Sequence, residues 1–234
     1  MNYTFNDLMI AYIRGYIISN KINVNSNLIN KDINSLNDEE INELISIGKS
    51  LDLKLYYFKE KEDLPRVNIV LGFLKGIYPS TLLDVGSGRG VFLFPLLRDF
   101  SYMDITSIDI LDNRVELLNY LKIGGINNLN VCKENICDYK IEDNSYEVVT
   151  LLEVLEHIPN VGEAIKNAVR IASKFVILTV PSKEDDNPEH IHLLTKDKLT
   201  KLFNDAGMTN LKFGGVNGHL FMIGRKEWLY EWYN

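Results

Sequence analysis

Cysteine is scarce in this chain of 234 residues, which contains only two. Cys132 and Cys137 lie five positions apart, and no second pair supplies the spacing of a zinc knuckle or of a disulfide framework. The sequence therefore excludes a fold held together by disulfides or structural zinc. We expect both thiols to be reduced, as in a cytoplasmic protein.

Long apolar runs are also lacking. No stretch approaches the roughly 20 consecutive apolar residues that a membrane-spanning helix requires, and polar or charged residues such as Asn2, Asp7 and Arg14 lie in and around the first apolar segment. No internal repeat is visible. The sequence predicts a soluble, cytoplasmic protein that does not use a membrane as its partner.

Basic residues are outnumbered by acidic ones. The chain has 25 Lys and Arg against 32 Asp and Glu, which gives a formal net charge of -7. Such a protein attracts phosphate backbones weakly, so long nucleic acids are disfavoured as substrates, although a locally basic groove is not excluded. The hydrophobic content of 46% suffices for one substantial core, which predicts one catalytic domain with a small appendage. Nothing in the composition indicates an oligomeric state.

The most informative motif is a glycine-rich turn after an apolar run. Asp84 ends this run, and Gly86, Gly88 and Gly90 follow at alternate positions. A loop of this kind accepts positive φ angles and lets a ligand approach its backbone closely, at the start of the next helix. The dinucleotide-binding pattern of dehydrogenases requires G-x-G-x-x-G, whereas the sixth position here is Val91. A dehydrogenase is therefore disfavoured.

A second acidic residue follows the next predicted strand. Asp109 ends the segment 103–109 and lies 21 residues after Gly88. In α/β nucleotide-binding folds, an acid at about this distance accepts hydrogen bonds from ribose hydroxyls. The alternative is that Asp109 caps a helix over 112–121.

With this motif and spacing, the sequence resembles the class I S-adenosylmethionine (SAM)-dependent methyltransferases over roughly residues 66–227. The resemblance implies an α/β fold with a Rossmann-like, seven-stranded, mostly parallel sheet that ends in an antiparallel C-terminal hairpin. It also implies SAM as cofactor. The cofactor-binding residues that it implies are Asp84, Gly86, Gly88, Gly90, Asp109, Ile110, Asn135, Ile136 and Leu152.

The adenine-binding position departs from the family pattern. Family members usually carry an Asp followed by a small apolar residue after the third strand, and the alignment places Asn135 and Ile136 there. The side-chain carbonyl of Asn can still accept a hydrogen bond from an exocyclic amine. Asp138 is the competing candidate for the same role.

The N-terminal segment precedes the core fold. Apolar residues at helical spacing predict a helix over 4–19, residues 20–34 are expected to form a loop, and Ser35 or Asn37 is expected to cap a second helix. Pro65 is placed to begin the helix that leads into the first strand. We therefore predict a small N-terminal helical cap, residues 1–64, and a methyltransferase domain, residues 65–234.

The candidate catalytic residues follow the fourth predicted strand. On a helical turn, Glu153, Glu156 and His157 would share one face, and His192 arrives after the fifth strand. Two carboxylates and two imidazoles can hold a divalent metal such as Mg²⁺, which lowers the pKa of an acceptor hydroxyl. This E-x-x-E-H pattern with a later His is similar to that of ubiquinone-pathway O-methyltransferases and of small-RNA 3′-terminal 2′-O-methyltransferases.

A metal-free site is the alternative, because Leu-Glu-His after the fourth strand also occurs in family members that need no metal. His192 then acts as a general base or orients the substrate, and His190 is expected to be a bystander. The chain has Leu152-Glu153-Val154-Leu155 where methyltransferases of base amines carry an Asn-Pro-Pro-Tyr type motif, so base methylation is disfavoured.

The resulting hypothesis is methyl transfer from SAM to an oxygen of a small molecule. The alternatives are an RNA ribose 2′-O-methyltransferase and a SAM-binding protein without turnover.

Overall fold

The computed structural model describes residues 3–59, 64–184 and 186–227 of the chain. In chain order the elements are α1 (Phe5–Ser19), α2 (Ser26–Asn30), η1 (Ile33–Ser35), α3 (Asp38–Ser50), η2 (Leu55–Phe58), α4 (Pro65–Ile77), β1 (Thr81–Val85), α5 (Leu93–Asp99), β2 (Asp104–Asp109), α6 (Asp112–Ile123), β3 (Leu129–Lys133), β4 (Tyr146–Leu152), η3 (Leu155–His157), α7 (Val161–Ile171), β5 (Ala172–Pro181), α8 (Lys196–Asp205), β6 (Asn210–Val216) and β7 (His219–Arg225). None of the helices in these ranges is both long and apolar enough to span a membrane.

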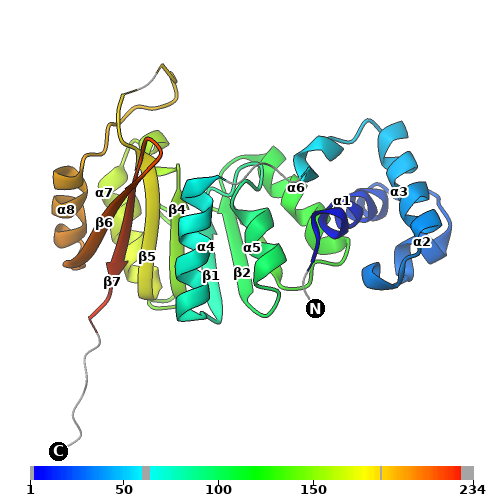
Figure 1. Ribbon diagram of the computed structural model, residues 1–234, viewed down its shortest axis with the longest axis horizontal. Helices are drawn as coiled ribbons and strands as arrows, with labels where there is room; N and C mark the ends of the chain where they lie inside the picture. The colour runs from blue at the N-terminus through cyan, green and yellow to red at the C-terminus, as the bar shows by residue number, and fades with distance from the viewer. Residues whose placement is uncertain (1–2, 60–63, 185, 228–234) are drawn as a thin grey trace, which may run out of the picture. The chain divides into compact units, whose positions relative to one another are not determined.

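The seven strands follow the order β3-β2-β1-β4-β5-β7-β6 (Figure 1). β1 pairs with β4, β4 with β5 and β2 with β3 in parallel, whereas β7 lies antiparallel between β5 and β6. Asn217 and Gly218 join β6 to β7 with φ angles of 40° and 83°, as a two-residue hairpin turn requires. The predicted α/β fold with a Rossmann-like, mostly parallel sheet and an antiparallel C-terminal hairpin is confirmed.

The chain forms two compact units. The first comprises Met1–Asp63 and Ser87–Lys133, and the second comprises Leu64–Gly86 and Glu134–Asn234. The division into a cap of residues 1–64 and a domain of residues 65–234 stays a prediction. Each unit is described by itself below.

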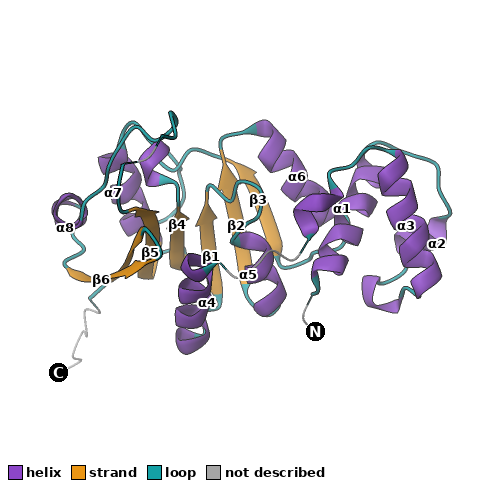
Figure 2. Cartoon of the chain, turned by 45° about the horizontal axis from the view of Figure 1, so that its top comes forward, coloured by secondary structure: helices purple, strands orange, loops and turns teal. Residues whose placement is uncertain are grey.

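Helix α1 of the first unit begins after Thr4, whose side chain accepts a hydrogen bond from the N–H of Asp7 in a capping box. It packs against α6 (Figure 2). At this contact Gly15 faces the backbone carbonyl of Tyr120, and Gly124 faces that of Ala11, each without room for a Cβ atom. Glycine is therefore required at two points of the contact between α1 and α6.

The expected loop over residues 20–34 was wrong in part, because it contains the helical turns α2 and η1. Asn25 and Asp32 cap these turns, each accepting a hydrogen bond from the N–H two residues ahead. Leu28 and Ile33 are buried there, Leu28 in the core shared by α1 and α3. Each turn buries a single side chain, so the sequence shows no repeating apolar pattern that would have predicted it.

The second unit carries its helices on both faces of its strands. Helix α4 begins at Pro65, as predicted, and its Phe73 packs edge-on against Phe175 of β5, with ring centroids 5.3 Å apart. Helix α7 covers the opposite face of β4 and β5, and α8 packs beside α7 (Figure 1). This arrangement buries the apolar strands on both sides, as parallel sheets require.

Candidate functional site

In the first unit, the glycine loop is a tight turn. Gly88 and Gly90 have φ angles of 55° and 79°, and the N–H of Gly90 donates to the carbonyl of Ser87 at 2.9 Å. The ring of Phe94 occupies the space that a Cβ at Gly90 would need. Position 90 is thus limited to glycine both by its backbone conformation and by packing.

Asp109 ties this loop to the end of β2. One of its carboxylate oxygens accepts from the N–H of Gly88 at 3.2 Å, and the other accepts from the N–H of Leu111 at 3.0 Å. Asp109 is 8% exposed, whereas the next two side chains, Ile110 and Leu111, are 61% and 51% exposed. The N-cap of α6 is Leu111, which makes no side-chain cap hydrogen bond, so Asp109 supports the helix only through that N–H. A buried carboxylate beside an exposed apolar surface suits a ligand with hydroxyls and a flat ring.

The second unit contributes Asp84 and Gly86. Asp84 is 2% exposed within β1 and accepts a hydrogen bond from the hydroxyl of Thr150 on the paired strand β4 at 2.8 Å. Gly86 has a φ angle of 66°, and a Cβ there would lie 2.8 Å from Val154. Asp84 is therefore fixed by the sheet, and the loop begins in a conformation that favours glycine.

The predicted adenine-contacting residues, Asn135 and Ile136, follow β3. The side-chain oxygen of Asn135 accepts from the N–H of Cys137 at 3.0 Å, which uses one of its two lone pairs. Ile136 is 3% exposed, so its side chain belongs to the core and only its backbone remains for a ligand. Leu152 is the last residue of β4.

The prediction that Glu153, Glu156 and His157 share one helical face is wrong. Glu153 has a φ angle of 57°, which no helix tolerates, and its N–H still bonds the carbonyl of Thr179 on β5 at 2.9 Å. Helical structure is limited to the single turn η3. The ladder between β4 and β5 holds Glu153 in place, so the chain bends sharply before the turn begins.

Glu153 instead pairs with His219, the first residue of β7. Nε2 of His219 lies 3.0 Å from one carboxylate oxygen of Glu153, and Nδ1 lies 3.1 Å from the carbonyl of Asn217. Both neighbours are acceptors, and a neutral imidazole has one N–H to donate to one of them. The second carboxylate oxygen of Glu153 is buried, with no hydrogen-bond partner among the described residues. Our sequence reasoning missed His219, although the hairpin turn before it placed it at the end of β5.

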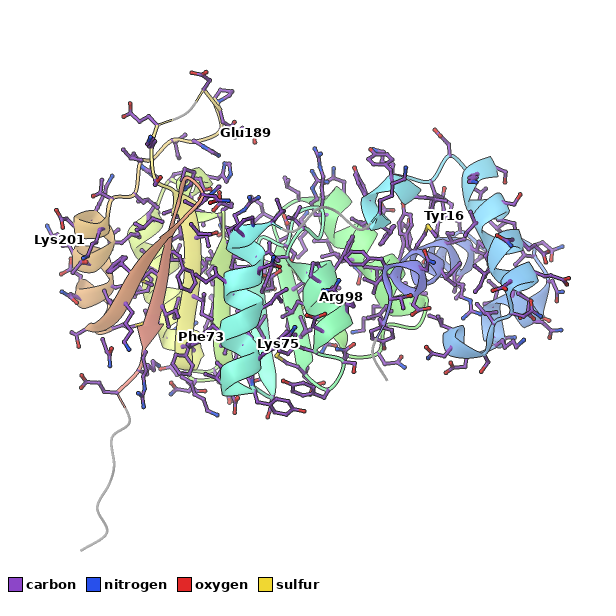
Figure 3. The ribbon with its side chains drawn as sticks, viewed as in Figure 1. Tyr16, Phe73, Lys75, Arg98, Glu189 and Lys201 are labelled. Atoms are coloured by element: carbon purple, nitrogen blue, oxygen red, sulfur yellow. The ribbon has the colours of Figure 1, made fainter. Side chains whose placement is uncertain are left out.

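Glu156, His157 and His190 form a cluster in which one ligating atom of each lies within 4.8 Å of the others. Glu156 is fully buried, and His157 is exposed. Nδ1 of His157 donates to the carbonyl of Glu189 at 3.0 Å, which leaves the lone pair on Nε2. Figure 3 labels Glu189 on the loop between β5 and α8, from which His190 also comes.

Backbone hydrogen bonds decide which histidine joins this cluster. The N–H of Ile191 donates to the carbonyl of Glu156 at 2.9 Å, which holds His190 beside the turn, whereas Nε2 of His192 lies 3.4 Å from the carbonyl of Pro159. The expected grouping of Glu153 and His192 with Glu156 and His157 is therefore not what the structure brings together. His190 takes part instead of being a bystander.

Known proteins were compared with this chain. A family model described as a methyltransferase domain matches residues 67–212. Over 193 residues the chain is 25% identical to the ubiquinone biosynthesis O-methyltransferase of Rickettsia prowazekii (strain Madrid E), covering 70% of this chain and 72% of that protein.

Two solved structures share the fold. The N-terminal domain of EvdMO1, crystallised in the presence of SAH and D-fucose, has a TM-score of 0.57 at 12% identity and covers 71% of this chain and 85% of that one. A SAM-dependent methyltransferase from Archaeoglobus fulgidus has a TM-score of 0.54 at 13% identity, covering 68% and 94%.

Proposed function

The chain belongs to the methyltransferase domain family and is a SAM-dependent methyltransferase, and from this premise we propose that its methyl acceptor is an oxygen atom of a small molecule. The similar Rickettsia protein is named an O-methyltransferase. The net charge of -7 disfavours a long polyanionic substrate. The proposal depends above all on the cluster of Glu156, His157 and His190 after β4.

The residues present suit the cofactor. When bound, SAM supplies a methyl group on a sulfonium sulfur. Within the described part of the chain, Asp109 accepts from two N–H donors and retains lone pairs for ribose hydroxyls, and the exposed Ile110 offers an apolar surface to the adenine ring. We assign Gly88 and Gly90 to the close approach of the backbone. In the second unit, Asp84, Gly86, Asn135, Ile136 and Leu152 keep their predicted cofactor roles.

An oxygen acceptor must lose its hydroxyl proton as the methyl group arrives. Nε2 of His157 carries a lone pair because Nδ1 donates to the carbonyl of Glu189, and it is exposed to an incoming hydroxyl. The buried Glu156 beside it stabilises the imidazolium that forms, since opposite charges attract strongly where water is excluded. His157 is therefore the proposed general base, and Glu156 the proposed charge partner.

The same three side chains also fit a divalent metal ion. Two imidazoles and one carboxylate favour ions such as Zn²⁺, Fe²⁺ or Ni²⁺, whereas Mg²⁺ prefers sites made of oxygen ligands. The donor set therefore argues against Mg²⁺. Glu156, His157 and His190 would hold the ion, which would lower the pKa of the acceptor hydroxyl.

The proposal is tested by incubating the protein with SAM carrying a labelled methyl group, a panel of phenols, catechols and aliphatic alcohols, and matching amines. We expect label in hydroxyl acceptors and a fall of at least 100-fold in kcat for His157→Ala. The matched control is Glu163→Gln, a half-buried residue of α7 outside the cluster, which should retain activity. Transfer to amines alone would refute the oxygen acceptor.

Adding a chelator to the assay distinguishes the metal-free mechanism, with His157 as general base, from the metal-assisted one. Activity that is lost on chelation and restored by Zn²⁺ or Fe²⁺ supports a metal, whereas unchanged activity leaves His157 as the base. Transfer to RNA with a steep salt dependence would instead favour ribose methylation. SAM binding without product from any acceptor would favour a non-catalytic protein.

A further inference from the structure

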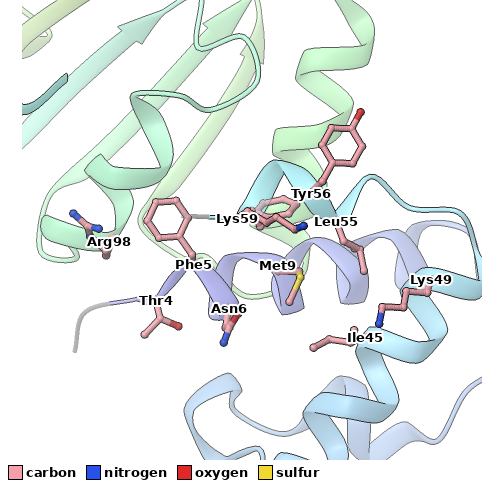
Figure 4. Close-up of a pocket in the computed structure, with 11 residues that line it drawn as sticks. Thr4, Phe5, Asn6, Met9, Ile45, Lys49, Leu55, Tyr56, Lys59 and Arg98 are labelled. Atoms are coloured by element: carbon pink, nitrogen blue, oxygen red, sulfur yellow. The ribbon is translucent and has the colours of Figure 1, made fainter. Parts of the chain in front are cut away.

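A pocket of about 600 Å³ opens in the first unit, between α1, α3, η2 and α5 (Figure 4). It is lined by Thr4, Phe5, Asn6, Met9, Ile45, Lys49, Leu55, Tyr56, Phe58, Lys59 and Arg98. Its volume lies within the range of about 300–1,000 Å³ that is usual for small-molecule sites. None of its residues belongs to the predicted cofactor or catalytic set.

Most of the lining is apolar. Phe5 and Met9 of α1, Ile45 of α3 and Leu55 of η2 are only half-buried, although each contributes a large hydrophobic side chain. Figure 4 shows Met9, Leu55 and Ile45 on three of the elements that enclose the pocket. An apolar ligand would remove these surfaces from water, which contributes roughly 25 cal/mol per Å² buried.

The charges around the pocket are of one sign. The described residues of its lining include the cations Lys49, Lys59 and Arg98 and no carboxylate, in a chain whose net charge is -7. Nε of Arg98 is paired with Asp99 at 2.6 Å, and its guanidinium lies over the ring of Phe5. Among the residues that the structure describes, Lys49 and Lys59 make no ion pair. Two lysine charges thus remain for a ligand.

Two stacked aromatic rings connect the pocket to the glycine loop of the same unit. The ring of Phe58, 3% exposed, stacks on Phe94 with centroids 4.9 Å apart and an interplanar angle of 16°. Phe94 in turn fills the space next to Gly90. A ligand that contacts Phe58 therefore touches a side chain that stacks on Phe94, which in turn packs beside Gly90 of the loop.

We propose that this pocket binds an anionic amphiphile, a molecule with a linear apolar chain that ends in a carboxylate. The chain would lie on Phe5, Met9, Ile45 and Leu55, and the carboxylate would be held by Lys49 and Lys59. This binding site is independent of the methyl acceptor. It follows from the coincidence of an apolar lining with two lysine side chains at one pocket.

Calorimetric titration of the full chain with decanoate, below the concentration at which it forms micelles, tests the proposal. Decyltrimethylammonium and decyl glucoside carry the same apolar chain with a cationic and a neutral head. We expect decanoate to bind at least tenfold tighter than either. This comparison uses the unmodified protein, so it does not depend on whether a variant folds.

Charge reversal locates the site. The double variant Lys49→Glu with Lys59→Glu should weaken decanoate binding at least tenfold and should not weaken decyltrimethylammonium binding. Lys201→Glu, on α8 of the second unit (Figure 3), makes the same kind of charge change outside the pocket and should leave decanoate binding unchanged. Equal binding of the three amphiphiles, or equal binding of decanoate by the double variant and the wild type, would overturn the proposal.

Discussion

Replacing Gly15 with alanine should separate α1 from α6. A Cβ at residue 15 would lie 1.8 Å from the carbonyl oxygen of Tyr120, whereas non-bonded carbon atoms approach to about 3.5 Å. The obstacle is backbone, which cannot rotate away as a side chain can, so the helices must move apart. The affected contact includes Ala11, which is fully buried and faces Gly124, and Tyr12, which is 7% exposed and has its ring centroid 5.9 Å from that of Tyr120.

The expected magnitude combines two opposing effects. Overpacking a close contact costs about 1–3 kcal/mol, and a rigid carbonyl places Gly15→Ala at the upper end or beyond. Alanine is favoured over glycine in a helix by about 1 kcal/mol, which offsets part of this loss. We expect the free energy of unfolding to fall by about 2 kcal/mol. Gly72→Ala on α4 is the matched control, because nothing lies within 4 Å of a Cβ built there, and it should gain about 0.5–1 kcal/mol.

Urea denaturation, followed by circular dichroism and analysed by linear extrapolation, measures both variants. A first transition that involves only part of the helical signal would show that residues 1–64 unfold separately from the remainder. If Gly15→Ala is as stable as Gly72→Ala, the close contact between α1 and α6 does not exist and the reasoning is refuted.

Three further outcomes are expected. Asp109→Asn should weaken SAH binding by about 10- to 100-fold in calorimetry, since each hydrogen bond to a charged group contributes about 1.5–3 kcal/mol; an unchanged affinity would remove Asp109 from the site. Burial raises the pKa of Glu147, but hydrogen bonds from Lys174 and a backbone N–H outweigh it and hold the pKa below its usual 4.5. A depressed folded-state pKa contributes stability above the unfolded value, so stability should fall as the pH drops below about 4.5, and Glu147→Gln should flatten that fall in acid titrations of Tm. Glu153 is a predicted catalytic residue whose carboxylate lies 3.0 Å from Nε2 of His219, so His219→Asn should lower kcat by about tenfold or more by releasing it, and an unchanged kcat would contradict a positioning role for His219.

The sequence was sufficient for features that depend on neighbouring residues. Two turns illustrate this: the loop with Gly86, Gly88 and Gly90, and the Asn-Gly turn before β7. Both require backbone conformations that few residues other than glycine adopt, so the local order of residues indicates them. The cap at Asn37, one of the two predicted candidates with Ser35, is equally local, because its side chain accepts from a backbone N–H three residues ahead. The order of strands and helices followed from their hydrophobic periodicity.

The site after β4 was harder to predict. The spacing of Glu153, Glu156 and His157 suggests one helical face, yet hydrogen bonding of Glu153 to β5 prevents a helix from starting there. The choice between His190 and His192 is decided by one backbone hydrogen bond, from Ile191 to Glu156. Spacing alone does not reveal such contacts, because they join segments separated by more than 25 residues.

By itself, then, the sequence indicated the glycine loop and the acidic residue at position 109, since each has a local pattern with a physical cause, and its resemblance to the class I SAM-dependent methyltransferases implied the fold class. Only the tertiary structure decided the partners of Glu153 and Glu156 and the pocket lined by Lys49 and Lys59. The physical reason is that these groupings depend on how distant segments pack, and packing selects partners by shape and hydrogen bonding, neither of which leaves a period in the chain.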